Sequence, residues 1–316
     1  MIAQPMKHQF ALGVDVGGTS SRWALMDSAG SDIAHGDGPG FSGAELLAPT
    51  GFDRVRQCVE QLASTVPAGA DSVYAGVTGI GAGSAALQSI FARAFRLPDA
   101  AVSIASDVEI ACRAAFTPGE GYLVYAGTGS IAAFIDETGA LQRAGGRGVL
   151  LDDAGGGYWM AREALRRVWR REDESPGAWQ HSPMAQRLFN AVGGDSSIFS
   201  ARFLMERDRG EVGRLALIVA ECAEVDGLAR DILRDAGGEL ARLANAMVGR
   251  FGQRPVTIAG RAALMHELIQ HAARARIAPD VPVNWRTLEA HVAAAKCAVE
   301  RLRTNTTDKE RQHGIS

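Results

Sequence analysis

The residues best suited to chemistry lie close to the amino terminus of the sequence. An apolar run ends at Asp15, passes through Gly17, Gly18 and Thr19, and resumes at Arg22. This pattern predicts a β-hairpin whose Gly-rich loop carries a carboxylate on one side and hydroxyl groups on the other. Glycine lets backbone N–H groups come close to a ligand, so such a loop can bind phosphate oxygens. The Lys and the following helix of a Walker loop are missing, and an ordinary hairpin with a Gly-rich turn stays open as the alternative.

A second acidic residue, Asp107, follows a strand that we predict over residues 101–104. Ser106 and Glu109 have the spacing of a capping box, which predicts that a helix begins here with Asp107 at its first position. Ligands of open α/β sheets bind outside the carboxyl ends of strands, so Asp107 is a candidate general base. The other interpretation is that its charge only stabilises the helix N-terminus.

The hairpin pattern returns in residues 121–141, GYLVYAGTGSIAAFIDETGAL. Here Gly127, Thr128, Gly129 and Ser130 take the place of the first Gly-rich loop. An internal duplication of this kind predicts two similar domains, each of which contributes a phosphate-binding hairpin to a cleft between them.

A third Gly-rich segment, GGRGVLLDDAGGGYW, spans residues 145–159 and contains Asp152 and Asp153. An arginine-rich helix follows it. We interpret the arginine stripe as a solvated helix face rather than a nucleic-acid site, because EDE follows directly and the chain has a net charge of −3. The stripe consists of Arg162, Arg166, Arg167, Arg170 and Arg171.

The rest of the chain alternates between strand and helix patterns, which indicates an α/β architecture. Further strands are predicted at residues 72–77 and 256–259. Helices are predicted from about residue 52 to 66 and over residues 84–96, 262–274 and 287–302. Residues 183–251 are predicted to be mostly helical. Residues 32–43 are predicted to form a polar loop, and residues 304–316 a disordered tail. Gly260 follows the predicted strand at residues 256–259. Because glycine has no side chain, we expect the backbone here to come close to a nucleoside.

Composition excludes several classes of protein. The pI near 6.2 gives no electrostatic reason to expect nucleic acid or an anionic membrane as a partner. No apolar run is long enough to cross a bilayer, and MIAQPMKHQF lacks the apolar core of a signal peptide. The four cysteines, Cys58, Cys112, Cys222 and Cys297, are scattered without metal-binding spacing, which predicts reduced thiols in a cytoplasmic protein.

Five motifs together resemble the actin, Hsp70 and sugar-kinase superfamily: DVGGTSSRWAL, SDVEIA, YAGTGSIA, GRGVLLDDAGGGYW and VTIAGRAAL, in this order. Within it, the chain is most similar to the BadF/BadG/BcrA/BcrD ATPase family and its N-acetylglucosamine kinase-like members. The resemblance covers residues 10–303 and implies two ribonuclease-H-like, actin-like ATPase domains with ATP in the cleft between them. We expect an N-terminal domain over residues 1–117, completed by helix 287–303, and a C-terminal domain over 118–286 with a helical insertion at 160–250.

The resemblance also implies a role for each motif. Asp107 would be the general base. The ATP phosphates would be bound by Asp15, Gly17, Gly18, Thr19, Gly127, Thr128 and Gly129, and the adenosine by Gly260 and Arg261. The sugar would be bound by Asp107, Ser130, Gly146, Arg147, Gly148 and Asp153. Asp15 would hold Mg²⁺, in part through water.

Three residues depart from the family pattern. Ala154 and Gly156 stand where relatives carry the Glu and Ser of GDEGS, and Arg261 stands where they carry a second Gly. The first hypothesis is an ATP-dependent hexosamine kinase, a homodimer that phosphorylates the 6-hydroxyl of N-acetylglucosamine or a related amino sugar. The alternatives are an activator ATPase of the 2-hydroxyacyl-CoA dehydratase or benzoyl-CoA reductase type, which needs closely placed cysteines, and a sugar-binding pseudokinase.

Overall fold

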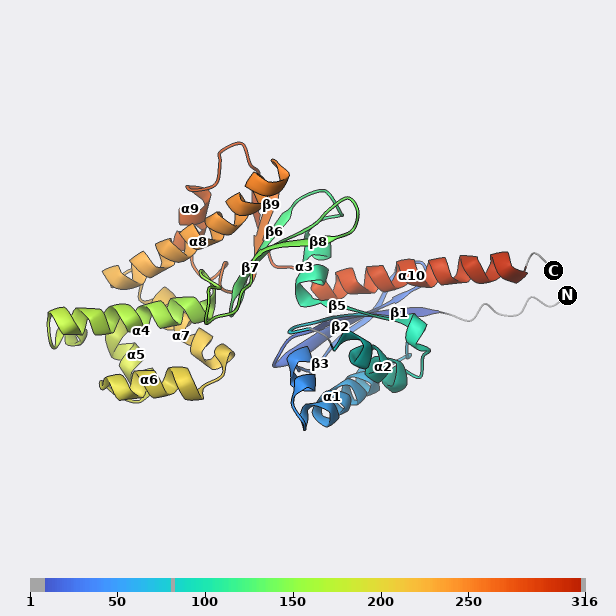
Figure 1. The fold of residues 1–316 in the computed structure, drawn as a ribbon, viewed down its shortest axis with the longest axis horizontal. Coiled ribbons are helices and arrows are strands. Elements are labelled where there is room, and N and C mark those ends of the chain that lie inside the picture. Colours follow the sequence, from blue (N-terminus) through green and yellow to red (C-terminus); the bar gives the residue numbers. More distant parts are fainter. Residues whose placement is uncertain (1–8, 81–82, 314–316) are drawn as a thin grey trace. The chain divides into compact units, whose positions relative to one another are not determined.

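The computed structural model describes residues 9–80 and 83–313, with side chains described as far as residue 304. The chain divides into two compact units. Unit 1 comprises Met1–Ala114 and Glu289–Ser316, and unit 2 comprises Ala115–Leu288. Each unit contains one five-stranded sheet, as the ribbon in Figure 1 shows. The final helix therefore belongs to the same unit as the first strand.

The two sheets share one topology. The strand order is β3-β2-β1-β4-β5 in unit 1 and β10-β9-β6-β7-β8 in unit 2. In each sheet the first three strands form an antiparallel meander. The fourth strand pairs in parallel with the first, and the fifth pairs in parallel with the fourth. The mixed α/β fold with two such sheets agrees with the predicted fold class. The repeated topology places the two Gly-rich hairpins, β1-β2 and β6-β7, at equivalent positions of their own sheets.

The elements of unit 1 match most of the predicted ones. Its strands are β1 (Phe10–Val16), β2 (Ser20–Asp27), β3 (Asp32–Pro39), β4 (Ser72–Val77) and β5 (Val102–Ser106). Its helices are η1 (Gly43–Leu47), α1 (Gly51–Thr65), α2 (Ser84–Phe95), η2 (Asp99–Ala101), α3 (Asp107–Ala115) and α10 (Ala290–His313).

Helices cover both faces of the unit 1 sheet. Leu12 and Val14 point to the face covered by α1 and α2, and Ala11 points to the face covered by α10. This alternation follows from the two-residue period of a strand. A Cβ atom at Gly13 would lie 1.9 Å from the backbone nitrogen of Ala295, so α10 crosses β1 in direct backbone contact.

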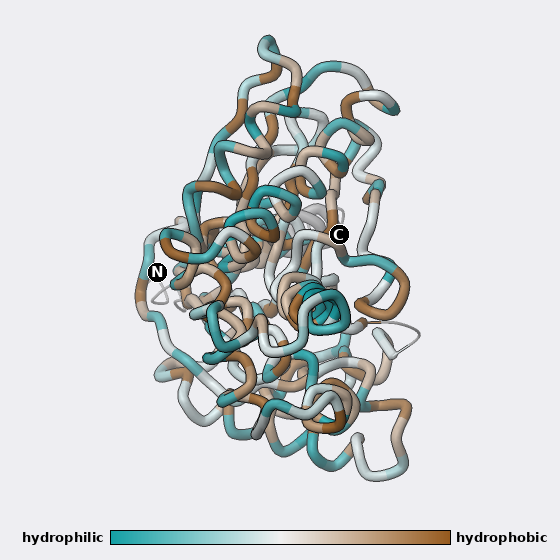
Figure 2. Tube along the Cα trace, turned by 90° about the vertical axis from the view of Figure 1, so that its left-hand side faces the viewer, coloured by the Kyte–Doolittle hydropathy of each residue, from teal (hydrophilic) through white to brown (hydrophobic). Residues whose placement is uncertain are grey.

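Unit 2 adds a helical layer to its sheet. Its strands are β6 (Tyr122–Ala126), β7 (Ser130–Ile135), β8 (Leu141–Gly145), β9 (Val256–Ala259) and β10 (Val283–Trp285). Its helices are α4 (Gly157–Glu174), η3 (Ala178–His181), α5 (Pro183–Val192), α6 (Ser197–Glu206), α7 (Arg209–Glu221), α8 (Gly227–Phe251) and α9 (Glu267–Arg274). Buried side chains of α4, α7 and α8 form one core with the sheet. Figure 2 shows hydrophobic and hydrophilic residues interspersed along the chain trace, and amphipathic helices bury their hydrophobic residues against such a core.

The structure differs from several sequence-based expectations. The segment predicted as a polar loop forms strand β3 instead. In this strand Gly36 makes room for the Trp23 ring, because a Cβ atom at Gly36 would lie 2.4 Å from that ring. The short edge strands β8 and β10 were not predicted. Helix α9 begins at Glu267 rather than at Ala262. Helix α10 begins at Ala290 and its backbone is helical to His313, whereas a disordered tail was predicted from residue 304. Residues 314–316 lie outside the described residues.

Candidate active site

Three parallel strands of unit 1 end together beside the first hairpin loop. Val16, Val77 and Ser106 lie in register across β1, β4 and β5. Asp15 comes just before this row of residues and Asp107 just after it. The two predicted carboxylates therefore lie at the carboxyl edge of the sheet, which is where open α/β sheets bind their ligands.

The loop of the first hairpin is a tight, open turn. The N–H of Gly17 donates a 3.0 Å hydrogen bond to the carbonyl of Ser20, while Gly18 and Thr19 are exposed. Neither Gly17 nor Gly18 has a positive φ, so the backbone conformation of the loop does not itself require glycine. A Cβ atom at Gly18 would meet nothing within 4 Å. Gly18 therefore leaves open space above the loop.

Asp107 occupies the first turn of α3, which is tied to the sheet by its neighbours. Ser106 caps the helix by accepting the N–H of Glu109 at 3.1 Å. The carboxylate of Glu109 bonds instead to the hydroxyl of Tyr74 on β4, at 3.1 Å, and to the guanidinium of Arg113, at 3.0 Å. Only half of the predicted capping box is thus formed, and the other half is replaced by a tether that fixes the turn carrying Asp107.

Asp15 and Asp107 interact electrostatically. The pKa of Asp15 is raised to about 6, chiefly by burial; the Arg22 guanidinium lowers it and the Asp107 carboxylate raises it. Arg22, the direct cross-strand neighbour of Asp15, lies 3.9 Å from its carboxylate. Two acidic groups with one partly exposed arginine leave an incompletely neutralised negative charge, and such a site favours an added cation.

The second hairpin loop is braced from behind by a helix. The first backbone N–H groups of α4 point at it: Gly157 donates to the carbonyl of Gly127, at 2.8 Å, and Tyr158 to that of Thr128, at 2.9 Å. Within the loop, Gly127 donates to Gly129 at 2.9 Å. The N-terminus of α4 therefore holds the carbonyls of the second hairpin loop.

Two of the predicted sugar residues are held within unit 2. Ser130 is buried and donates its hydroxyl to the carbonyl of Ala154 at 2.6 Å. Asp153 is buried with a φ of +52°, and it accepts the N–H of Gly148 at 2.9 Å. Burial raises the pKa of Asp153, while the Gly148 N–H lowers it. A Cβ at Gly129 would lie 2.3 Å from the Asp153 carboxylate, so a larger residue there would have to displace that side chain. These contacts link the third Gly-rich segment to the second hairpin.

The turn of Gly146, Arg147 and Gly148 lies at the surface. Both glycines have positive φ angles, 63° and 92°, which explains the residue type at these positions. Two leucines follow that the sequence analysis did not single out: Leu150 is 87% exposed and Leu151 is 83% exposed. The sequence pattern that could have indicated them is an apolar pair within an otherwise polar, Gly-rich segment.

Gly260 is required by the fold of unit 2. It has a φ of +100°, and a Cβ there would lie 2.3 Å from the carbonyl oxygen of Ala126. That carbonyl also accepts the N–H of Ala262 at 3.0 Å. The end of β9 is thereby joined to the end of β6, directly before the second hairpin loop. Arg261 is exposed and forms no hydrogen bond or ion pair within the part of the chain described here.

The departures from the family pattern have physical consequences. Ala154 is buried, and its carbonyl is the acceptor for Ser130. At Gly156, a Cβ would lie 2.7 Å from the Thr128 carbonyl oxygen and from the Cα of Gly129. A serine at this position would therefore displace the hairpin loop, and glycine is the residue that this packing accepts.

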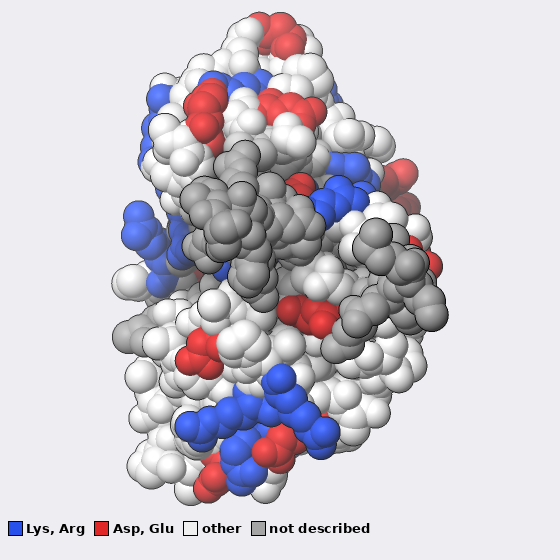
Figure 3. Space-filling view, turned by 90° about the vertical axis from the view of Figure 1, so that its right-hand side faces the viewer, with Lys and Arg blue, Asp and Glu red and all other residues white. Residues whose placement is uncertain are grey.

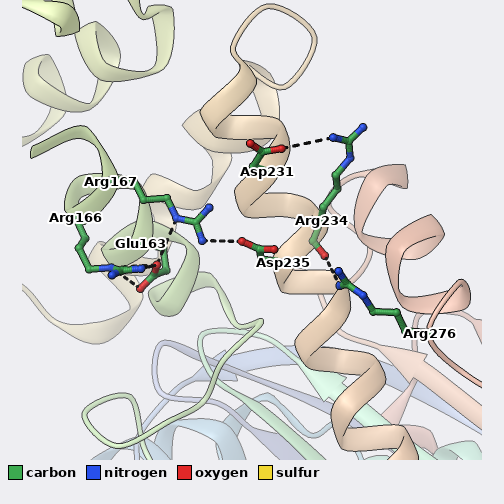
Figure 4. A network of polar contacts seen from close by, with 7 residues as sticks. All are labelled: Glu163, Arg166, Arg167, Asp231, Arg234, Asp235 and Arg276. Carbon is green, nitrogen blue, oxygen red and sulfur yellow. Dashed lines mark hydrogen bonds and ion pairs between the residues drawn. The ribbon is translucent and has the colours of Figure 1, made fainter. Parts of the chain in front are cut away.

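The arginine stripe is only partly a solvated face. Glu163 is buried on α4 and binds Arg166 and Arg167, and Arg167 reaches Asp235 of α8 at 2.7 Å. Figure 4 shows this network, which joins the two helices. The interpretation as a merely solvated stripe is wrong for these two arginines, because a buried carboxylate needs charged partners.

The described residues offer few other candidate sites. No group of three His, Cys, Asp or Glu side chains is placed to hold a metal ion among them. The four cysteines are free thiols. None of the described helices is both long and apolar enough to cross a membrane. Figure 3 shows basic and acidic side chains mixed on one face. On α1, Arg56 pairs with Asp53 and Glu60.

Known proteins resemble this chain over most of its length. The glucosamine kinase GspK of Vibrio cholerae is 25% identical over 236 residues, which cover 73% of this chain and 78% of that protein. The structure of a candidate N-acetylglucosamine kinase from Chromobacterium violaceum is 25% identical and matches with a TM-score of 0.69, covering 93% of this chain and 99% of that one.

A structure from Porphyromonas gingivalis, also described as a candidate N-acetylglucosamine kinase, matches with a TM-score of 0.70 at 16% identity and covers 92% of this chain and 99% of that one. This last likeness concerns the fold alone. The model of the BadF/BadG/BcrA/BcrD ATPase family matches residues 12–291, which include both hairpins and both acidic residues of the sheet edge. The chain belongs to the BadF/BadG/BcrA/BcrD ATPase family.

Proposed function

We propose that this protein is an ATP-dependent hexosamine kinase that transfers the γ-phosphoryl group to the 6-hydroxyl of N-acetylglucosamine or a related amino sugar. The observation that carries the proposal is the pair of carboxylates at the edge of the unit 1 sheet, Asp15 and Asp107, which interact beside an open Gly-rich loop. Membership of an ATPase family and likeness to a glucosamine kinase support it.

Asp107 is the residue we assign as general base. It lies on a short helix whose first turn is tethered by Glu109 to Tyr74, so its carboxylate is held at a defined place. It accepts the proton of the sugar hydroxyl as that oxygen attacks phosphorus, and this role needs hydrogen-bond reach more than an unusual pKa. Phosphoryl transfer otherwise depends on positioning and on neutralising phosphate charge.

The two hairpin loops supply the groups that bind phosphate. Gly17, Gly18 and Thr19 of the first loop and Gly127, Thr128 and Gly129 of the second offer backbone N–H groups and hydroxyls to phosphate oxygens. In our proposal Gly260 and Arg261 lie at the adenosine. The sugar is contacted by the turn of Gly146, Arg147 and Gly148, by Asp107, and by Ser130 and Asp153, which also position that turn.

Mg²⁺ fits the donors of unit 1. Asp15 is a carboxylate whose pKa is raised by burial and by the charge of Asp107, so its ionised form gains from a nearby cation. Mg²⁺ commonly uses one or two carboxylates and takes its other ligands from water and phosphate. When bound, it would supply charge neutralisation at the phosphates.

A coupled assay of ADP release across a panel of hexoses and amino sugars tests the proposal. We expect turnover with at least one amino sugar and a higher kcat/KM for it than for glucose. Mass spectrometry of the product would locate the phosphate on the 6-oxygen. Tight ATP binding without turnover of any sugar would contradict the kinase assignment and favour a sugar-binding pseudokinase or an activator ATPase.

The activator alternative has its own test. Such a protein carries an iron–sulfur cluster, whereas Cys112 and Cys222 are buried and lie in different units. Iron analysis of the protein purified without oxygen should find less than one iron atom per chain. A stoichiometric cluster would overturn the kinase proposal.

A further inference from the structure

A surface hollow of about 400 Å³ lies at the open edge of the unit 1 sheet. Its lining comes from β4, β5, α2, α3 and α10, and the polar lining residues are Tyr74, Ser84, Gln88, Ser103, Glu109 and Arg301. Sites for small molecules commonly span about 300–1,000 Å³, so the hollow is large enough for one. Neither Asp15 nor Asp107 belongs to the lining.

The hollow contains polar groups with unused hydrogen-bonding capacity. The hydroxyl oxygen of Ser103 is buried and has no partner among the described residues. The contacts of Glu109 with Tyr74 and Arg113 engage one of its carboxylate oxygens, which leaves the other free for a ligand. A buried hydroxyl without a partner loses the hydrogen bonds that it had in water, so a bound ligand group would restore them.

The charges on the lining are of opposite sign. Among the described residues, the guanidinium of Arg301 has one hydrogen bond, at the distance limit, 3.5 Å to the carbonyl of Ala100. Glu109 supplies the negative charge on the other side, with the hydroxyls of Ser84, Ser103 and Tyr74 completing the polar lining. This set matches a ligand that has an anionic group for arginine and several hydroxyl or ammonium donors for the carboxylate and hydroxyl oxygens.

The hollow lies beside the edge strand β5, apart from the carboxyl ends of the strands where Asp15 and Asp107 lie, but both places share helix α3. The apolar cluster of Ala105, Ile110, Ala290 and Ala294 packs against Tyr74. Glu109 lies on the first turn of α3, two residues beyond Asp107. A ligand that hydrogen-bonds Glu109 would therefore act on the tether that fixes the turn carrying the proposed base.

We propose that this hollow is a second ligand site, for a small polyhydroxylated anion of sugar-phosphate size, and that its occupation changes turnover through α3. The binding does not depend on the proposed kinase activity, whereas the effect on turnover does. The geometry assigns Arg301 to the anionic group, and Ser103 and Glu109 to the hydroxyl or ammonium groups.

Calorimetry with glucosamine 6-phosphate tests the binding. The titration is done with saturating ADP and N-acetylglucosamine, so that the proposed active site is filled. We expect one equivalent to bind to the wild-type protein, at least about tenfold more weakly to Arg301→Met and several-fold more weakly to Ser103→Ala, as loss of a charged and of a neutral hydrogen bond predicts. Arg303→Met, on the same helix and outside the lining, is the matched control and should bind like wild type.

Three results would overturn the second site. The first is no binding of glucosamine 6-phosphate by the wild-type protein, and the second is binding by both the Arg301→Met and the Ser103→Ala variants as tight as by wild type. The third is binding of inorganic phosphate as tight as that of glucosamine 6-phosphate, which would show a plain anion site. If Arg301→Met does not fold, Ser103→Ala still decides. The kinetic part is tested by adding glucosamine 6-phosphate at saturating substrates, which should change kcat in wild type and leave kcat of Arg301→Met unchanged. Absence of all sugar turnover would refute the proposed function but leave the calorimetric result standing.

Discussion

The two Gly-rich hairpins occupy equivalent positions in sheets of the same topology, yet their surroundings differ. The first loop is open: a Cβ at Gly18 would touch nothing, and two carboxylates lie beside it. The second loop is packed, with the N-terminus of α4 behind it and a Cβ at Gly156 only 2.7 Å from its backbone. The two hairpins thus differ, so that one lies beside two carboxylates and the other is packed against α4, where we infer that it acts as a rigid support.

This comparison predicts that the largest loss of activity follows from a change in unit 1. Asp107→Asn removes the proposed base and leaves the cap of α3 in place, so we expect kcat to fall by about 10²–10⁴-fold with normal ATP binding. Asp53→Asn changes a solvent-exposed aspartate at the start of α1 and serves as the matched control. Turnover by Asp107→Asn at the wild-type rate would show that the base assignment is wrong.

The largest loss of stability should follow from a change in the packed hairpin. Gly156→Ala forces a Cβ against the carbonyl of Thr128 and the backbone of Gly129, and overpacking of this kind costs roughly 1–3 kcal/mol. Urea unfolding of the wild-type protein and the variant measures this difference in the free energy of unfolding. An unchanged unfolding midpoint would mean that the loop moves freely, and that it does not act as a rigid support.

The same substitution in the open hairpin should have the opposite signature. Gly18→Ala places its Cβ in empty space, so the free energy of unfolding should stay within about 0.5 kcal/mol of wild type. Because that space is the proposed phosphate site, we expect the KM for ATP to rise by roughly threefold to tenfold, the equivalent of about one hydrogen bond. An unchanged KM for ATP would show that the ATP phosphates do not bind above Gly18.

The pH dependence of stability offers a fourth test, at the edge of the unit 1 sheet. The pKa of Asp15 in the folded protein, about 6, lies above its ordinary value of 3.8. Between these two pH values, the Asp15 carboxyl group is protonated in the folded protein but ionised in the unfolded chain. Wild-type stability therefore falls as the pH rises from about 4 to 6, and Asp15→Asn lacks this loss. At pH 7 we expect the variant to be more stable by roughly 1–3 kcal/mol, and equally stable below pH 4, in thermal unfolding without nucleotide. A variant that is less stable at pH 7 would contradict the assigned shift.

The duplicated α/β fold was predictable because the hairpins and the strand-to-helix alternation leave local signals. The antiparallel turns at Gly17 and Gly127 and the helix cap at Ser106 depend on neighbours in sequence. Strand β3 was missed because its HGDGPG segment has no strand signal of its own. It forms because Gly36 makes room for Trp23 of the adjacent strand, which is a contact between strands.

The positions of the candidate site residues were partly predictable for the same reason. Residue types and spacing indicated Asp15 and Asp107 as chemical groups, and their register follows from parallel pairing of three strands. The tether from Glu109 to Tyr74 and the support of the second loop by Gly157 were not predictable, since each joins residues far apart in the chain. The sequence also gives no sign that the Ser130 hydroxyl is engaged by Ala154.

Helix α10 has a consequence for how the chain matures. It covers the face of the unit 1 sheet that carries Ala11, Ala24 and Met26, yet it is encoded after all of unit 2. During translation this face stays uncovered until the last helix leaves the ribosome, while unit 2 already has its complete sequence. A nascent chain stalled before residue 290 would therefore expose the apolar stripe to chaperones, and a premature stop codon there would release a polypeptide that degradation machinery can recognise.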